Sequence, residues 1–153
     1  MKLSTRGRYA MIALADLAAS DRDEIMSLAD IAQRQSISLP YLEQLFVKLR
    51  RAGIVESVRG PGGGYRLARS PDAIRVAEVL AAVDETIDAL KPGGGATGGQ
   101  SGTREQSLVN RLWEGLSAHV YVYLHAIRLS DVVDNQLAPC PAVPSLFQIE
   151  DAK

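Results

Sequence analysis

A glycine-rich turn constrains the fold of this chain more than any other stretch of its sequence. Residues 57–67 read SVRGPGGGYRL, in which three consecutive glycines follow a proline and lie between two arginines. Glycine loses more backbone freedom on folding than any other residue, so a run of glycines needs a specific reason. Runs that favour β-strands flank the glycines, at residues 53–58 and 64–68, and this arrangement predicts a β-hairpin.

Three interpretations of this turn are open: a phosphate cradle, a plain hairpin turn, or a loop that lies close against a ligand. A phosphate-binding loop needs Gly-Lys-Ser/Thr before a helix, whereas here Gly64 and Tyr65 precede a strand. A plain hairpin turn needs one or two glycines rather than four. We therefore favour a loop that approaches a ligand.

Apolar periodicity predicts two helices early in the chain. Apolar side chains in residues 5–19 suit one broad helical face, and Asp16 interrupts a run that would otherwise imitate a signal peptide. Ser27 followed by Asp30 is an approximate capping box for a short helix that ends near Gln33. No apolar run approaches the roughly 20 residues that cross a bilayer, so we expect no membrane partner.

A third helix is expected over residues 39–53, where Ser38 can cap the N-terminus and Gly53 ends the helix. Its apolar residues recur at three- and four-residue spacing, which leaves a polar face for a partner. Two short helices, a four-residue turn, a helix with a polar face and a glycine-tipped hairpin occur in the order of a winged helix-turn-helix. In such a domain a helix fills the major groove of DNA while the hairpin reaches the backbone or the minor groove. The expected fold class is mainly α with a small β-wing.

The remainder of the chain predicts two further helices separated by a loop. Residues 76–90 have a helical pattern, whereas residues 91–102, KPGGGATGGQSG, lack core-forming side chains and predict a flexible loop. Thr103 and Gln106 form a second capping box, and the apolar pattern after them predicts a helix to about Arg128. So long a helix after so small a domain predicts packing against a second copy, which makes it a C-terminal dimerisation helix.

These patterns divide the chain into three regions: a winged helix-turn-helix DNA-binding domain in residues 1–70, a dimerisation and sensor region in residues 71–136, and a mobile tail in residues 137–153. The first region carries eleven Lys and Arg against seven Asp and Glu, a net charge of +4, whereas the remainder has a net charge of −5. The basic part is therefore the part expected to meet DNA. A single cysteine excludes an internal disulfide and fits a reducing, cytoplasmic compartment.

Several segments, taken as a set, resemble the bacterial transcription regulators of the IscR type, which control iron–sulfur cluster assembly and related genes. The segments are MKLSTRGRYAMIALADLA, LADIAQRQSISLPYLEQLFVKLRRAGIVESVRGPGGGYRL, VAEVLAAVDET, and LW with the long helix that ends in LSDVVDNQ. The resemblance covers the chain to about Gln136. It implies a homodimer, with base or phosphate contacts by Tyr41, Glu43, Gln44, Arg50, Arg59 and the wing glycines.

The candidate DNA-binding residues have distinct physical roles. Glu43 can accept a hydrogen bond from a cytosine amino group, and Tyr41 and Gln44 can contact adenine or phosphate. Arg59 can enter a narrow minor groove, while glycines let backbone amides approach phosphate. For Tyr41, Glu43, Gln44 and the cations Arg6, Arg8, Lys48 and Arg50, the alternative is a solvated surface position, and for the glycine turn it is a hairpin without a partner. The full candidate set is Arg6, Arg8, Ser38, Tyr41, Glu43, Gln44, Lys48, Arg50, Arg59, Gly60, Gly62 and Gly63.

The resemblance fails at the sensor. IscR-type proteins are expected to hold a 2Fe-2S cluster with three cysteines in the loop before the long helix and a histidine at the start of that helix. The corresponding positions here are near Pro92, Gly98, Ser107 and Asn110, none of which offers a thiolate or an imidazole. The usual cluster site is therefore absent.

Three interpretations of sensing remain open. The chain has lost sensing, or Cys140 ligates a 2Fe-2S cluster together with His119 or His125 of a second copy, or Cys140 is a cofactor-free thiol switch. Mixed cysteine and histidine ligation occurs in Rieske centres. The two histidines lie six residues apart, so one helix cannot direct both to one metal.

The sequence thus predicts a homodimeric, sequence-specific DNA-binding transcriptional regulator, more readily a repressor, of iron–sulfur cluster assembly or iron homeostasis genes. It predicts no enzyme and no small-molecule substrate, because a Cys140 nucleophile on a mobile tail lacks the preorganisation that catalysis requires. The alternative from another class is a protein-interaction module that does not read DNA. The net positive charge of residues 1–70 argues against that alternative.

Overall fold

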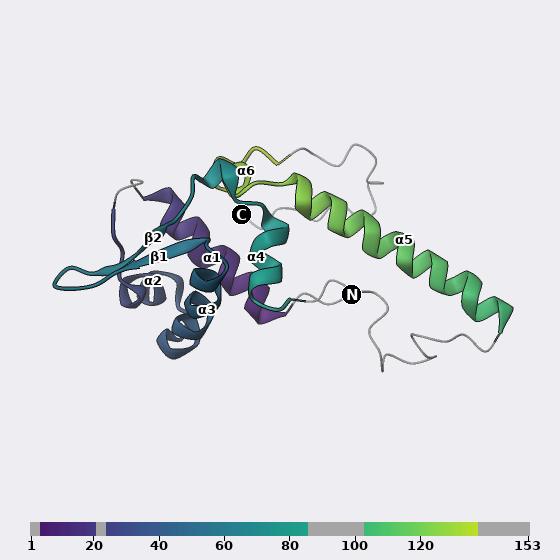
Figure 1. Cartoon of the computed structure of the whole chain (residues 1–153), viewed down its shortest axis with the longest axis horizontal. Helices are drawn as coiled ribbons and strands as arrows, with labels where there is room; N and C mark the ends of the chain where they lie inside the picture. The colour runs from purple at the N-terminus through teal and green to yellow at the C-terminus, as the bar shows by residue number, and fades with distance from the viewer. Residues whose placement is uncertain (1–3, 21–23, 86–102, 138–153) are drawn as a thin grey trace.

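The structure is a computed structural model that describes residues 4–20, 24–85 and 103–137 (Figure 1). The described residues are mostly helical, with one antiparallel hairpin, and their elements in chain order are α1 (Thr5–Ala19), α2 (Leu28–Gln35), α3 (Leu39–Arg51), β1 (Val55–Val58), β2 (Gly64–Leu67), the 3-10 helix η1 (Pro71–Ala73), α4 (Val76–Ala82), α5 (Arg104–Ala126) and α6 (Leu129–Val133). This arrangement confirms the expected fold class of helices with a small β-wing.

Helix α1 is central to the core, where it packs against α2, α3, α4 and α6. Its small and apolar residues, Ala10, Ala13, Leu14 and Leu17, are buried and allow the surrounding helices to approach closely. The fully buried Phe46 of α3 meets Tyr65 of β2 edge-on, with ring centroids 5.0 Å apart. Since aromatic pairs favour this T-shaped geometry, the contact holds α3 and the hairpin together.

The hairpin, called the wing here and comprising residues 55–67, is anchored by a third segment at the first residues of β2. Tyr65 exchanges two backbone hydrogen bonds with Met26, of 2.9 and 2.8 Å. A Cβ on Gly64 would lie 2.3 Å from the Met26 carbonyl oxygen, so only glycine permits this approach. The wing is thus held from both sides, by α3 and by the chain before α2.

Local sequence signals place most helix ends correctly. Helix α1 spans the predicted residues, and the side chains of Ser27 and Thr103 accept backbone hydrogen bonds at the starts of α2 and α5, as expected. Helix α2 runs two residues further than predicted, to Gln35. Helix α3 ends just before Gly53, whose φ of +73° suits a helix C-terminus.

Two local predictions are wrong. Ser38 occupies the N-cap position of α3 but makes no side-chain capping bond, and Pro40 at the second position removes one of the two N–H groups that could donate to it. The helix expected over residues 76–90 ends at Ala82, and Asp84 adopts a left-handed φ of +56°. Residues 86–90, the loop 91–102 and the tail from 138 lie outside the described residues, so the division into three regions stays a prediction.

Helix α5 extends away from the body of the molecule (Figure 1). It ends at Ala126, two residues before the predicted end, and none of its residues is buried. Large apolar side chains are exposed along it, with Leu112 62% exposed; the others are Leu108, Val109, Trp113, Leu116, Tyr121, Val122 and Tyr123. Within the described residues, no helix is both long and apolar enough to cross a membrane.

Candidate nucleic-acid interface

Helix α3 presents a polar side to solvent beside the wing. The buried residues Leu42, Leu45, Phe46 and Leu49 recur every three or four residues and fix which side of the helix faces the core. On the opposite side, Glu43, Gln44 and Arg50 are exposed, as is Ser38 just before the helix. These four predicted site residues therefore lie on an accessible surface.

Two of the candidates on α3, Tyr41 and Lys48, have partners in other helices or in the turn after α4. The Tyr41 ring is half-buried and packs edge-on against Tyr9 of α1, with centroids 5.8 Å apart. The Lys48 Nζ lies 2.5 Å from an Asp84 carboxylate oxygen. The hydrogen bond from Lys48 and the positive charge of Lys48 hold the pKa of Asp84 below the usual value for aspartate. The structure thus adds a packing role to Tyr41 and an ion pair to Lys48.

The wing tip combines an exposed arginine with three glycines. Backbone conformation favours glycine at two of these positions, and lack of space requires it at the third. Arg59 is exposed, and Gly60 and Gly62 adopt φ values of +106° and +73°, which glycine tolerates and other residues rarely adopt. Gly63 is required within the turn, because a Cβ there would lie 2.4 Å from the Val58 carbonyl oxygen. A Cβ at Gly60 or Gly62 would meet no atom within 4 Å, so backbone conformation and not lack of space favours glycine at these two exposed positions.

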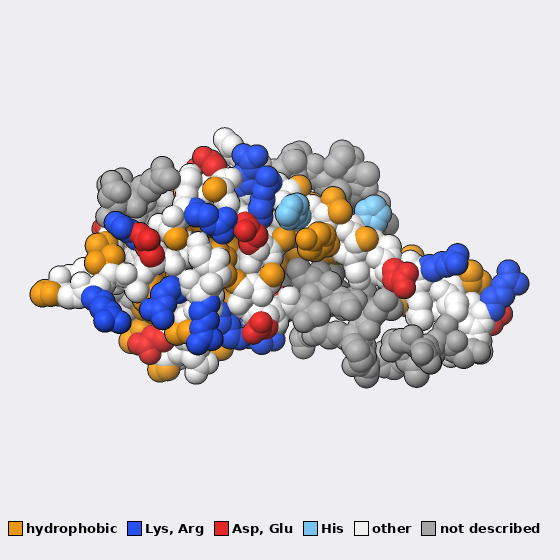
Figure 2. Space-filling view, viewed as in Figure 1, with side chains coloured by type: hydrophobic (Ala, Val, Ile, Leu, Met, Phe, Trp, Pro, Cys, Tyr) orange, Lys and Arg blue, Asp and Glu red, His pale blue; other side chains and the backbone are white. Residues whose placement is uncertain are grey.

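Cations divide into paired and unpaired groups. Arg66 of β2 pairs across the hairpin with Glu56, and Arg69 pairs with Glu78 at 3.3 Å, so both serve the fold. Within residues 4–70 of the described structure, the exposed arginines that form no salt bridge with a described carboxylate are Arg6, Arg8, Arg50, Arg51 and Arg59. Figure 2 shows Lys and Arg side chains along the lower left of the molecule, where Figure 1 places α3 and the wing.

Residue contacts also link α3 to the wing. The guanidinium of Arg50 donates to the Ser57 hydroxyl at 3.5 Å, so this arginine bridges the two elements that a winged helix-turn-helix presents to DNA. Together with the Phe46–Tyr65 contact, this bridge orients α3 and the wing relative to each other. A rigid pair of elements can engage a major groove and its flanking backbone at once.

The predicted set of DNA-binding residues omits two residues of this surface. Val47 is 37% exposed on the solvent side of α3, and Arg51 is exposed one turn further along the helix. Helical spacing was sufficient to find them, because Val47 follows Gln44 by three residues and Arg51 follows Val47 by four. An exposed valine in a DNA-binding helix can contact a thymine methyl group.

The candidate metal ligands do not come together in the described structure. Among the described residues no three His, Cys, Asp or Glu side chains could hold a metal ion. His119 is exposed on α5, and the His125 ring stacks on Tyr121 with centroids 5.8 Å apart. Ser107 and Asn110 also lie on α5, whereas Pro92, Gly98 and Cys140 lie outside the described residues. The donors described here therefore do not fit a 2Fe-2S cluster within one chain.

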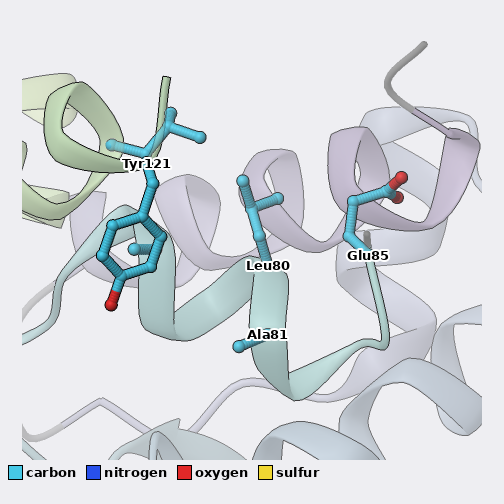
Figure 3. A pocket seen from close by; sticks show the side chains of 6 residues that line it. Leu80, Ala81, Glu85 and Tyr121 are labelled. Atoms are coloured by element: carbon cyan, nitrogen blue, oxygen red, sulfur yellow. The ribbon is translucent and has the colours of Figure 1, made fainter. Parts of the chain in front are cut away.

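A small cavity of about 120 Å³ lies between α4 and α5 (Figure 3). It is lined mostly by apolar side chains, and its polar groups are Glu85 at one end and Tyr121 at the other; the lining residues are Ala77, Leu80, Ala81, Glu85, Tyr121 and Leu124. The Glu85 carboxylate is directed toward α1, where it accepts hydrogen bonds from Ser4 and Gly7. The described lining thus contains no pair of groups for acid–base or nucleophilic chemistry.

The chain is similar in sequence to known transcriptional regulators. The family model of Rrf2, described as an iron-dependent transcriptional regulator, matches residues 3–135. The chain is 65% identical over 153 residues to the HTH-type transcriptional regulator IscR of Cereibacter sphaeroides, with 99% of each protein covered. It is 51% identical over 138 residues to IscR of Aliivibrio salmonicida, with 90% of this chain and 80% of the relative covered.

Solved structures agree with these matches. An IscR of T. potens superimposes with a TM-score of 0.70 at 33% identity, covering 96% of both chains. CymR, the global cysteine regulator of B. subtilis, superimposes with a TM-score of 0.73 at 31% identity, covering 88% of this chain and 98% of CymR. The relatives are named as transcriptional regulators and not as enzymes.

Proposed function

Because the chain belongs to the Rrf2 family of transcriptional regulators, and is a DNA-binding regulator of the IscR type, we propose that it acts as a homodimeric repressor of genes for iron–sulfur cluster assembly or iron homeostasis. The description of the family as iron-dependent supports the link to iron. A regulator of this kind acts where the chromosome lies, so we expect it in the cytoplasm.

The adjacency of α3 and the wing is the observation that carries this proposal. A helix about 10–12 Å wide fits a major groove about 12 Å wide, and the wing beside it reaches the next stretch of backbone. The unpaired arginines of α1, α3 and the wing supply phosphate contacts, which position the protein but do not read sequence. In this arrangement Glu43 and Gln44 read base edges, while Arg59 enters the minor groove.

The exposed apolar side chains of α5 support a dimer. This helix has 23 residues and so extends about 35 Å at 1.5 Å per residue. Val109, Leu112, Trp113 and Leu116 recur at three- and four-residue spacing along one side and are all exposed. Large exposed apolar patches mark interaction surfaces, and a second copy of α5 offers a matching one.

A symmetric dimer binds two half-sites about one helical turn, ~34 Å, apart. Footprinting on genomic DNA is expected to show a protected pseudo-palindrome with this spacing. Replacing Glu43 with Ala should relax base preference at one position of each half-site, and replacing the exposed Asp72 of η1 with Asn should leave base preference unchanged. Binding that ignores sequence would refute the proposal and favour a protein-interaction module.

For the sensor, we retain the hypothesis of a 2Fe-2S cluster that uses Cys140, the single cysteine of the chain. It requires donors beyond the described residues of one chain, such as those of a second copy. Anaerobic purification followed by an absorption spectrum and iron analysis tests it, with Cys140→Ser as the comparison. A colourless, iron-free protein would leave a cofactor-free regulator or a thiol switch, which sensitivity of DNA binding to oxidants distinguishes.

A further inference from the structure

The turn that follows α4 has an aspartate at the position where a helix terminus usually has glycine. The Asp84 N–H donates to the Ala81 carbonyl at 3.2 Å and the Glu85 N–H donates to the Leu80 carbonyl at 2.9 Å, so the chain folds back on the last turn. The residue that adopts the left-handed conformation in such a turn is usually glycine, yet here it is Asp84, with φ +56°. Aspartate tolerates this conformation better than most residues, and here its side chain also has a partner on another helix.

The two side chains of this turn reach two different helices of the DNA-binding region. Asp84 pairs with Lys48 of α3 at 2.5 Å. The Glu85 carboxylate accepts hydrogen bonds from the Ser4 N–H at 3.1 Å, from the Ser4 hydroxyl and from the Gly7 N–H at 3.1 Å. One dipeptide therefore joins the end of α4 to both α1 and α3.

Glu85 takes the place of the missing cap of α1. Ser4 occupies the N-cap position of α1, and its own side chain makes no capping bond. The carboxylate satisfies N–H groups at the start of the helix, where the helix dipole also favours a negative charge. Burial raises the pKa of Glu85, but the bonds from Ser4 and Gly7 outweigh this and keep the pKa below its ordinary value. The carboxylate is thus ionised and 9% exposed.

Gly7 shows how closely the two segments fit. A Cβ at this position would lie 2.9 Å from Leu80 Cδ2 and 3.1 Å from a Glu85 carboxylate oxygen. Glycine weakens a helix interior, so its presence in the first turns of α1 is explained by this approach of α4. In Figure 3, Glu85 lies beside the start of α1, at the opposite end of the cavity from Tyr121.

Arg6 and Arg8 lie on the turn of α1 that Glu85 holds, and both are exposed. We propose that Glu85 is a positioning residue for DNA binding, which fixes the first turn of α1 so that Arg6 and Arg8 meet phosphate, with Asp84 as a second anchor on α3. This inference rests on the proposed function. It goes further because it assigns part of the DNA affinity to a buried acidic residue outside the wing and α3. This residue follows α4, a helix that also contacts α5.

The test compares the affinity of full-length wild type and variants for the footprinted palindrome at several salt concentrations. Glu85→Gln is expected to weaken binding about three- to tenfold and to lower the salt slope by about one, the signature of a lost phosphate contact. Gly7→Ala should act in the same direction. Asp72→Asn removes the same charge from an exposed site and should leave affinity unchanged or slightly higher.

A double-mutant cycle separates positioning from general destabilisation. In a background with Arg6 and Arg8 both replaced by Ala, Glu85→Gln should have no further effect on affinity, because the residues through which it acts are gone. An equal loss in both backgrounds, or an unchanged affinity of Glu85→Gln, would overturn the inference while leaving the proposed function intact. A wild type that binds no palindrome would overturn both.

Discussion

Replacing Gly64 with Ala is expected to destabilise the fold by separating β2 of the wing from the chain before α2. The added methyl group would meet three backbone atoms, at 2.3 and 2.6 Å for the Met26 oxygen and carbon and 3.0 Å for the Ser27 nitrogen. Backbone cannot move aside as a flexible side chain does. The chain before α2 must therefore separate from β2.

The size of this effect follows from the contacts that separation breaks. Met26 and Tyr65 would lose two backbone hydrogen bonds, each worth about 1 kcal/mol net. The edge-on contact between Tyr65 and Phe46 adds about 0.5–1.5 kcal/mol if it loosens. We expect the free energy of unfolding to fall by about 2–3 kcal/mol, which lowers Tm by roughly 5–10 °C in a chain of this size.

Urea unfolding followed by circular dichroism measures this change, and Gly115→Ala provides a matched control. No described atom lies within 4 Å of a Cβ at Gly115 on α5, so that variant should keep its stability or gain up to about 1 kcal/mol. If the free energy of unfolding of Gly64→Ala lies within about 0.5 kcal/mol of the wild-type value, the close approach to Met26 is not the reason that residue 64 is glycine.

Three further outcomes follow from the structure. Arg59→Ala should weaken binding to the palindrome and lower the salt slope by about one, and an affinity unchanged at fixed salt would remove the wing from DNA recognition. Leu112→Asp should give a monomer in light scattering, with a red-shifted emission of the single Trp113, whereas Arg111→Ala on the opposite side of α5 should stay dimeric. Because the pKa of Glu85 is depressed in the folded state, its stabilisation is present above the unfolded pKa near 4.5 and is lost as pH falls through the lower folded value. Glu85→Gln should therefore flatten the acid limb of a plot of stability against pH, and an unchanged limb would contradict this.

Much of the candidate interface could be predicted from the sequence because its signals are local. The three- and four-residue spacing of buried leucines in α3 identified which side faces solvent, and with it Glu43, Gln44 and Arg50. The same spacing also implied Val47, which had been assigned to neither side of the helix. The predicted DNA contacts themselves stay predictions until a complex is measured.

Errors occurred where the outcome depended on distant atoms. The pattern of residues 76–90 is helical throughout, yet α4 stops at Ala82, since Asp84 and Glu85 turn to meet Lys48 and the start of α1. Glu85 and Ser4 are 81 residues apart in sequence, and no periodicity encodes such a pair. Gly64 was correctly placed at the start of a strand, but its close approach to Met26 could not be read from the local sequence.

The sequence by itself determined the elements whose hydrogen bonds close within a few residues: the extent of α1, the caps at Ser27 and Thr103, and the hairpin with its glycine tip. Tertiary structure alone decided where α4 ends, which cations are paired, and what caps α1. The physical reason is range, because helix and turn preferences act over three or four residues, whereas these contacts exist only after packing brings remote segments within hydrogen-bonding distance.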